Sequence, residues 1–181
     1  YEIAIAHSKD NPFKKYLEFL KELDELNQDE EVFYKGIGRE FISLLENTSM
    51  SKVYKMPVLM AFYNHGNILM EVSELISSWK EFFSTGTNWK DLDKNMTIQK
   101  YNSISDKEHL KKILSMPVHF LLESGKGFFV KKDGAAIGLR EELRPLIDNP
   151  VMVCQMKDVI DYRAMDYYQR RYRQSQEDGE V

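Results

Sequence analysis

Cysteine is almost missing from this chain. Cys154 is the only one among 181 residues, so an intrachain disulfide bond is impossible. That suits a reducing compartment, and we expect a cytoplasmic protein. Cys154 ends the apolar run 151–154 and has no histidine close in sequence. We therefore expect a small buried side chain there and not an activated nucleophile.

Long hydrophobic runs are also missing. No apolar stretch approaches the roughly 18 residues that can span a bilayer, so we expect no membrane partner. The chain begins at Tyr1 and shows no leader in which a basic segment precedes an apolar one. We expect it to be part of a longer protein.

Motifs of common catalytic sites are absent as well. The sequence has no G-x-x-x-x-G-K-[ST] loop, no H-E-x-x-H, no G-x-S-x-G and no paired cysteines. None of the four histidines has a second His or Cys at a spacing typical of metal ligands. They are His7, His65, His109 and His119. Glu71 follows a predicted strand, but no lysine stands two residues later to complete a nuclease pattern. We expect no cofactor, metal, small-molecule substrate or enzyme activity, and a degenerate nuclease is the minor alternative.

The charge of the chain is uneven, although its net value is only −4. Residues 1–53 hold 7 Lys/Arg against 11 Asp/Glu, whereas residues 107–144 hold 8 against 5. Residues 157–173 hold 5 against 3. Because phosphate-binding surfaces are basic, any nucleic-acid contact is predicted in the second half of the chain.

Both ends of the chain have helical apolar patterns. Within an N-terminal helical segment, 1–53, the spacing predicts a helix over 12–26, capped by Asn11, and a second helix over about 31–46. A long C-terminal helix is expected within 149–174, packed on the central part of the chain. The polar residues 175–181 are predicted to be disordered.

The central residues 54–148 carry the most informative pattern. The first expected elements are a helix over 54–63, a strand over 68–70 and a helix capped by Ser73. After a long connection over 84–104, a helix begins with a capping box of Ser105 and Glu108 and is broken near Pro117. Two strands follow, over 128–132 and 135–139. Asp133-Gly134 between the strands predicts a type I′ hairpin. The fold class is therefore mainly α with a small β hairpin, as a winged helix-turn-helix-like unit with flanking helices.

In a winged helix the third helix enters the major groove and the hairpin touches the DNA backbone or minor groove. Gly125-Lys126-Gly127 is interpreted as a turn into that hairpin. The candidate DNA-binding residues are Lys107, His109, Lys111 and Lys112 on the helix and Lys126, Lys131 and Lys132 at the hairpin. Lysines there would neutralise phosphates and position the protein without reading sequence. The long connection is unusual for such a unit, and a solvated helix face is the alternative interpretation of the lysines.

Several segments also carry a family resemblance. They are residues 54–63 (YKMPVLMAFY), the aromatic helix with Trp79, Phe82 and Phe83, residues 116–122 (MPVHFLL), residues 128–130 (FFV) and residues 158–168, which begin DVIDYR. This pattern resembles the C-terminal winged-helix-like region of large bacterial DEAD/DEAH-type helicases of restriction or defence systems. The resemblance implies an accessory domain beside a helicase core that lies outside this chain.

Two functions follow as hypotheses. The first is a non-catalytic accessory domain that binds or positions DNA, with the rest of the parent chain as a second partner. The alternative is a protein-protein interaction module that docks to the motor core or to a partner subunit. In that case the aromatic helix from Trp79 to Phe83 and the loop around Trp89 would line the interface.

Overall fold

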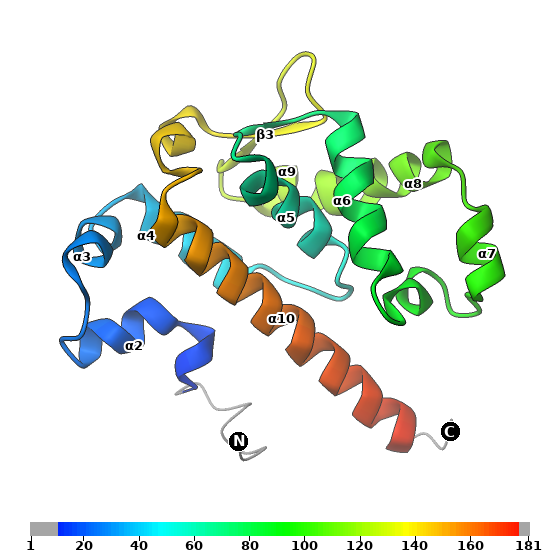
Figure 1. Cartoon of the computed structure of the whole chain (residues 1–181), viewed down its shortest axis with the longest axis horizontal. Coiled ribbons are helices and arrows are strands. Elements are labelled where there is room, and N and C mark those ends of the chain that lie inside the picture. The colour runs from blue at the N-terminus through cyan, green and yellow to red at the C-terminus, as the bar shows by residue number, and fades with distance from the viewer. Residues whose placement is uncertain (1–10, 178–181) are drawn as a thin grey trace. The chain divides into compact units, whose positions relative to one another are not determined.

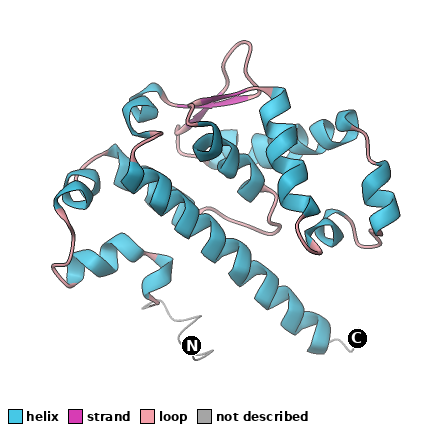
Figure 2. Ribbon diagram, in the orientation of Figure 1, coloured by secondary structure: helices cyan, strands magenta, loops and turns pink. Residues whose placement is uncertain are grey.

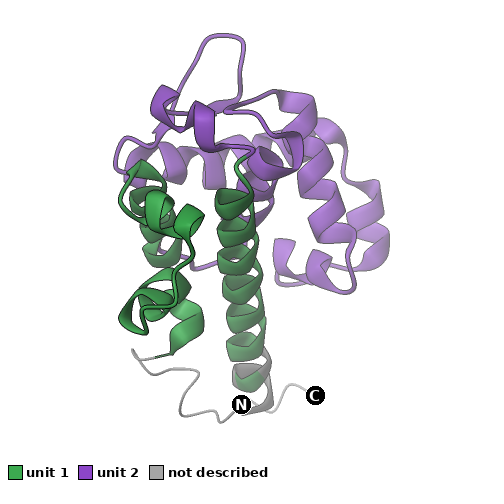
Figure 3. Ribbon diagram, turned by 60° about the vertical axis from the view of Figure 1, so that its left-hand side comes forward, with its two compact units in different colours: residues 1–48, 149–181 green, residues 49–148 purple. Residues whose placement is uncertain are grey.

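The computed structural model describes residues 11–177 as a mainly helical chain with one small antiparallel sheet (Figure 1, Figure 2). This confirms the predicted mainly α class with a small β component. The chain divides into two units, coloured separately in Figure 3: unit 1 comprises residues 1–48 and 149–181, and unit 2 comprises residues 49–148. The C-terminal helix, expected as a segment of its own that packs on the central residues, is grouped here with the N-terminal residues.

Unit 1 is entirely helical over its described residues. Its elements are η1 (Pro12–Lys14), α2 (Tyr16–Glu22), α3 (Gln28–Tyr34), α4 (Ile37–Asn47) and α10 (Pro150–Glu177). Asn11 caps η1 as predicted, since its side chain accepts a hydrogen bond from the Phe13 amide. The two predicted helices are each broken. Between the two predicted helices, Asn27 and Glu30 form a capping box that starts α3.

The start of α4 depends on glycine. Gly36 precedes α4 as its N-cap and separates it from α3. A Cβ atom at Gly38 would lie 2.3 Å from the Phe33 ring, so no larger residue fits there without moving that ring. The two glycines therefore divide a predicted single helix and let Phe33 pack against α4.

Helix α10 packs on η1, α3 and α4. Its buried side chains include Met152, Met156, Val159 and Ile160, which follow the predicted helical stripe. The helix is longer than predicted, because residues 175–177 are helical and not part of a disordered tail. The remaining residues of that predicted tail, 178–181, lie outside the described residues.

Unit 2 contains the predicted series of helices and strands with additional short helices. Its elements are α5 (Lys55–His65), β1 (Leu69–Met70), α6 (Val72–Ser84), η2 (Asn88–Leu92), α7 (Ile98–Ser103), α8 (Asp106–Ile113), η3 (Leu114–Val118), α9 (His119–Ser124), β2 (Phe129–Val130), β3 (Ile137–Leu139) and η4 (Glu141–Leu146). The expected long connection over 84–104 is thus partly helical, because it holds η2 and α7.

Local signals placed most of these elements correctly. The capping box of Ser105 and Glu108 is present at the start of α8. Pro117 lies in η3, a π-helical turn between α8 and α9, which confirms the predicted break. The cap of α6 was predicted wrongly: Glu71, paired with Glu74, occupies the position that Ser73 was expected to fill.

The sheet has the strand order β1-β3-β2, with both pairs antiparallel. Phe129 pairs with Leu139 and Val130 with Gly138, so residues 131–136 form the loop of the hairpin. The predicted type I′ turn is therefore wrong. Such a turn needs positive φ at both central residues, and here only Gly134 has it, with φ of 77°. The loop is wider than a two-residue turn.

The core of unit 2 is aromatic. Trp79, whose side chain is fully buried, has its ring centroid 4.5 Å from that of Phe83 and 5.5 Å from that of Tyr54.

Within residues 11–177 no helix combines the length and the hydrophobicity needed to cross a bilayer.

Candidate functional site

Five of the predicted DNA-binding lysines lie on the surface of unit 2. Lys107 and Lys111 are exposed on α8, and their spacing of four residues places them on one face of that helix. Lys126, Lys131 and Lys132 are exposed at the two ends of β2. Among residues 11–177, no carboxylate forms an ion pair with any of the five.

The start of α8 and the hairpin loop border one open hollow. Asp106, which precedes Lys107, and Gly134, which follows Lys132 by two residues, both line it. The other wall is the first half of α6, from Glu71 to Lys80. The hollow thus brings both lysine-bearing segments to one region of unit 2.

The two carboxylates next to Lys107 form an ion pair or hydrogen bonds with other groups. Asp106 forms an ion pair with Lys80, and the hydrogen bond from Lys80 lowers the pKa of this carboxyl. Glu108 accepts hydrogen bonds from Ser105, which lower the pKa of Glu108. Both groups therefore stay negative at neutral pH, but neither neutralises a lysine of α8.

His109 does not belong to this surface, which corrects the prediction. Its side chain is buried, at 3% exposure, and its Nδ1 accepts a hydrogen bond from Trp79 Nε1 at 3.1 Å. The Tyr101 ring packs edge-on against it. Burial, together with the positive charge of Lys80, lowers the pKa of His109. It is a neutral core histidine and cannot contact phosphate.

We expect the stability of the chain to depend on the charge of His109. Because its pKa is lowered on folding, the unfolded chain binds a proton at a higher pH than the folded chain does. Stability should be fully present above about pH 6.5 and should be lost as the pH falls below it toward the folded pKa. Urea unfolding at a series of pH values between about 7 and 5 measures this loss.

The matched control is His109→Gln, which can still accept the Trp79 hydrogen bond but does not titrate. The difference between the two proteins isolates His109 from carboxyl groups that titrate in the same range. An identical pH dependence in both would contradict the assignment.

Lys112 is also withdrawn from the predicted surface. The Lys112 side chain is half-buried. Its Nζ donates a hydrogen bond to the Leu92 carbonyl and lies 5.3 Å from the centroid of the Tyr54 ring. Burial lowers the pKa of Lys112. Tyr54 Oη donates to the carbonyls of Asp91 and Leu92, and Lys52 pairs with Asp91 at 3.0 Å. Lys112 thus helps to hold the end of η2 against α5 and α8.

Unit 2 also has an apolar hollow of about 180 Å³. It is lined on one side by residues of the 49–55 segment and on the other by Met116, Pro117 and Phe120. Met116 and Phe120 are exposed. The side chains predicted to line an interface behave differently, since Trp79 and Phe83 are fully buried in the core, whereas Phe82 and Trp89 are half-exposed.

No metal centre is visible in the described part of the chain, because residues 11–177 contain no group of three His, Cys, Asp or Glu side chains that could hold an ion. Cys154 is exposed and not buried as predicted. Partial burial and the nearby Asp158 raise the pKa of its thiol, which disfavours the reactive thiolate.

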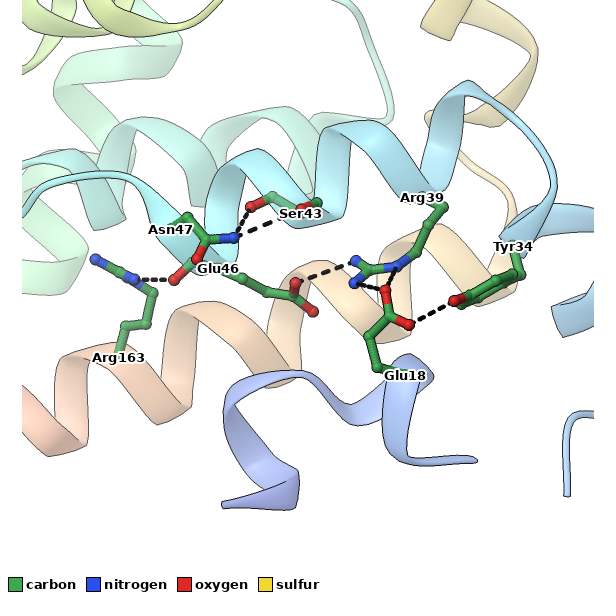
Figure 4. A network of polar contacts seen from close by, with 7 residues as sticks. All are labelled: Glu18, Tyr34, Arg39, Ser43, Glu46, Asn47 and Arg163. Carbon is green, nitrogen blue, oxygen red and sulfur yellow. Dashed lines mark hydrogen bonds and ion pairs between the residues drawn. The ribbon is translucent and has the colours of Figure 1, made fainter. Parts of the chain in front are cut away.

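Sequence reasoning missed a buried ionic network in unit 1, which Figure 4 shows. Arg39 of α4 lies between two carboxylates, with Nη2 2.6 Å from Glu18 Oε1 and Nη1 3.1 Å from Glu46 Oε2. Tyr34 Oη donates to the other oxygen of Glu18. Arg163 of α10 donates to the carbonyls of Glu46 and Thr48 and so caps the end of α4.

The two carboxylates that share Arg39 shift in opposite directions. Burial raises the pKa of Glu46 more than Arg39 lowers it, because the Glu46 side chain is only 1% exposed. Burial also acts on Glu18, but the hydrogen bonds from Tyr34 and Arg39 together lower its pKa. The spacings of 21 and 7 residues within this network match no local motif, so only the fold could reveal it.

A scan of protein-family models, a search of curated proteins and a search of solved structures each found no match to this chain. The function must therefore be argued from the side chains described above.

Proposed function

We propose that this chain is a non-catalytic accessory domain of a DNA-processing protein, and that unit 2 binds the DNA backbone in the manner of a winged helix. The order of helices and strands in unit 2, with its three-stranded sheet, supports this proposal. Helix α8 then takes the position of the groove-facing helix, and the loop over 131–136 takes that of the wing. In this proposal the motor core lies elsewhere in the parent protein, as the resemblance to helicase C-terminal regions implies.

The observation that carries the proposal is the exposure of five lysines on α8 and on both sides of β2, where the start of α8 and the hairpin loop border one hollow. They are Lys107, Lys111, Lys126, Lys131 and Lys132. None of them forms an ion pair with a described carboxylate, although the charge of Lys132 acts on Glu141, so phosphates can serve as their counter-ions. Lysine is a point charge and does not read base edges as a bidentate arginine does. We therefore propose binding that is independent of sequence.

The distribution of charge between the units agrees with this assignment. Residues 49–148 hold 14 Lys/Arg against 12 Asp/Glu, whereas the rest of the chain holds 11 against 17. Unit 1 would be repelled by a polyanion. DNA contact is therefore assigned to unit 2 alone.

A variant with all five lysines changed to glutamine tests the proposal. The wild-type chain should bind a fluorescent DNA duplex at low salt, and the variant should bind at least about tenfold more weakly, because each lysine removed gives up counter-ion release. Fluorescence anisotropy measures both affinities. Far-UV circular dichroism should show the same fold for both proteins, since the five side chains are exposed.

The control variant changes five exposed lysines outside this surface and so removes the same number of charges. Lys90, Lys94 and Lys100 are exposed in unit 2, and Lys35 and Lys157 are exposed in unit 1. Changing these five lysines to glutamine should leave the DNA affinity within about twofold of the wild-type value, apart from a general effect of net charge. Equal losses in both variants would refute the assigned surface.

Contact with a protein partner is a second candidate function, favoured by the apolar hollow beside η3. Exposed apolar side chains around a depression are typical of surfaces that accept an apolar side chain of a partner. Methionine adapts to such partners, and both Met50 and Met116 line the hollow. Phe120→Ser separates the candidates: it should leave DNA affinity unchanged if the lysines alone bind DNA.

A further inference from the structure

Helix α2 of unit 1 buries very little of its apolar surface. Leu17 is its only fully buried side chain. Tyr16 and Phe19 are 37% and 36% exposed, and Leu23, directly after the helix, is 54% exposed. Tyr16 and Leu23 belong to the helical apolar spacing over 12–26, and such a stripe is expected to face the core. The structure instead leaves them at the surface, on the side of α2 that unit 1 does not cover.

The sequence of this segment is symmetric about its centre. Counting outward from the point between Phe19 and Leu20 over residues 13–26, all but one of the pairs of residues at equal distances are chemically complementary. The apolar pairs are Phe19 with Leu20, Tyr16 with Leu23 and Phe13 with Leu26. The charged pairs of opposite sign are Lys15 with Asp24 and Lys14 with Glu25; Glu18 and Lys21 are also opposite in charge, but Glu18 is already paired with Arg39 inside unit 1. The one mismatch joins Glu22 to Leu17, which faces the interior of unit 1.

We propose that two copies of this chain associate through α2, antiparallel and around a twofold axis near Phe19. A twofold interface requires one surface to be complementary to itself, so that residue i meets residue j and residue j meets residue i. The symmetric pattern meets that requirement. In the pair, Tyr16 of each copy faces Leu23 of the other, and Lys15 faces Asp24.

The turn after α2 keeps the charged end in place. The Glu25 amide donates to the Leu20 carbonyl and the Asp24 amide to the Lys21 carbonyl, which is the Schellman arrangement. Asp24 has the left-handed φ of 59° that this turn requires. Asp24 and Lys15 are both exposed. The acidic end of the segment is thus ordered and available to the basic end of a second copy.

The association should be weak. A surface built on one short helix is smaller than the roughly 800 Å² per partner of a standard interface, so we expect a dissociation constant in the micromolar range or above. It does not depend on the DNA-binding proposal, because it uses unit 1 only. Within a larger protein the contact would bring two copies together at a modest energy.

Sedimentation velocity of the whole chain over a range of about 10 to 500 µM tests the inference by mass action. The wild type should shift from monomer toward dimer as its concentration rises. Leu23→Glu should stay monomeric over the range, because it buries a charge in each half of the interface. Val32→Glu is the matched control: Val32 of α3 is 71% exposed and lies outside the symmetric segment, so dimerisation should not change.

A charge exchange tests the antiparallel geometry. Lys15→Asp and Asp24→Lys should each weaken the dimer about tenfold, because each places two like-charged pairs in the interface. The double variant Lys15→Asp/Asp24→Lys should restore dimerisation, since it reverses both members of the pair. A wild type that is monomeric at the highest concentration, a dimer that survives Leu23→Glu, or a double variant that is not restored would each overturn the inference.

Discussion

Replacing Arg39 with methionine is expected to lower the free energy of unfolding by about 3 to 5 kcal/mol, because the change removes one partner of a buried ion pair and leaves the other charged. The change affects Glu46 most, because its side chain is 1% exposed and its Oε2 accepts a hydrogen bond from Arg39 Nη1. Glu18 is more exposed and can be hydrated in part. Urea denaturation measures the loss.

Two further proteins make this result specific. Lys35→Met breaks the exposed pair with Glu31 and should change stability by no more than about 0.5 kcal/mol. The double variant Arg39→Met/Glu46→Leu should recover most of the loss, because it removes the stranded charge as well. If Arg39→Met alone costs less than about 1 kcal/mol, the Glu46 carboxylate is not the buried anion that the structure shows.

Trp79→Ala is expected to cost about 3 to 5 kcal/mol of stability, the range for truncation of a large aromatic side chain in a core. Trp79 is fully buried, it packs against Tyr54 and Phe83, and it donates the hydrogen bond to His109. The change therefore leaves a cavity and removes the partner of a buried nitrogen. Thermal and urea unfolding followed by circular dichroism measure the effect without relying on tryptophan fluorescence.

The other tryptophan provides the control for that prediction. Trp89 lies in η2, is half-exposed and has Lys90 over its ring. Trp89→Ala should cost about 1 kcal/mol or less, as surface substitutions usually do. Equal losses for the two variants would contradict the description of Trp79 as the centre of the unit 2 core.

Signals that act over three or four residues predicted the local structure well. The Ser105 and Glu108 capping box, the Asn11 cap and the break at Pro117 each depend only on neighbouring residues, and each is present. The mainly helical class with a small sheet followed from the same signals. The type I′ turn predicted from Asp133-Gly134 was wrong. The turn depends on where β3 pairs, and β3 pairs with β1 as well as with β2.

The candidate site was only partly predictable, for a physical reason. His109 and Lys112 stand on α8 beside the exposed Lys107 and Lys111; helical periodicity turns His109 away from these two lysines, but it does not show that Lys112 is half-buried. What distinguishes them is the packing of Trp79 and of the η2 carbonyls on that helix, which brings together residues 20 to 30 positions apart. The same limit applies to Arg39 with Glu18. Long-range packing decides which charged side chains remain available at the surface.

The salt dependence of DNA binding tests the central claim most directly. If five lysines contact phosphates, the logarithm of the association constant should fall with the logarithm of salt concentration with a slope of about −4 to −5, and the five-lysine variant should have a slope near zero. Anisotropy titrations of one duplex at several salt concentrations give both slopes. A wild type that does not bind at low salt, or a variant with the wild-type slope, would contradict the assignment of DNA binding to this surface of unit 2.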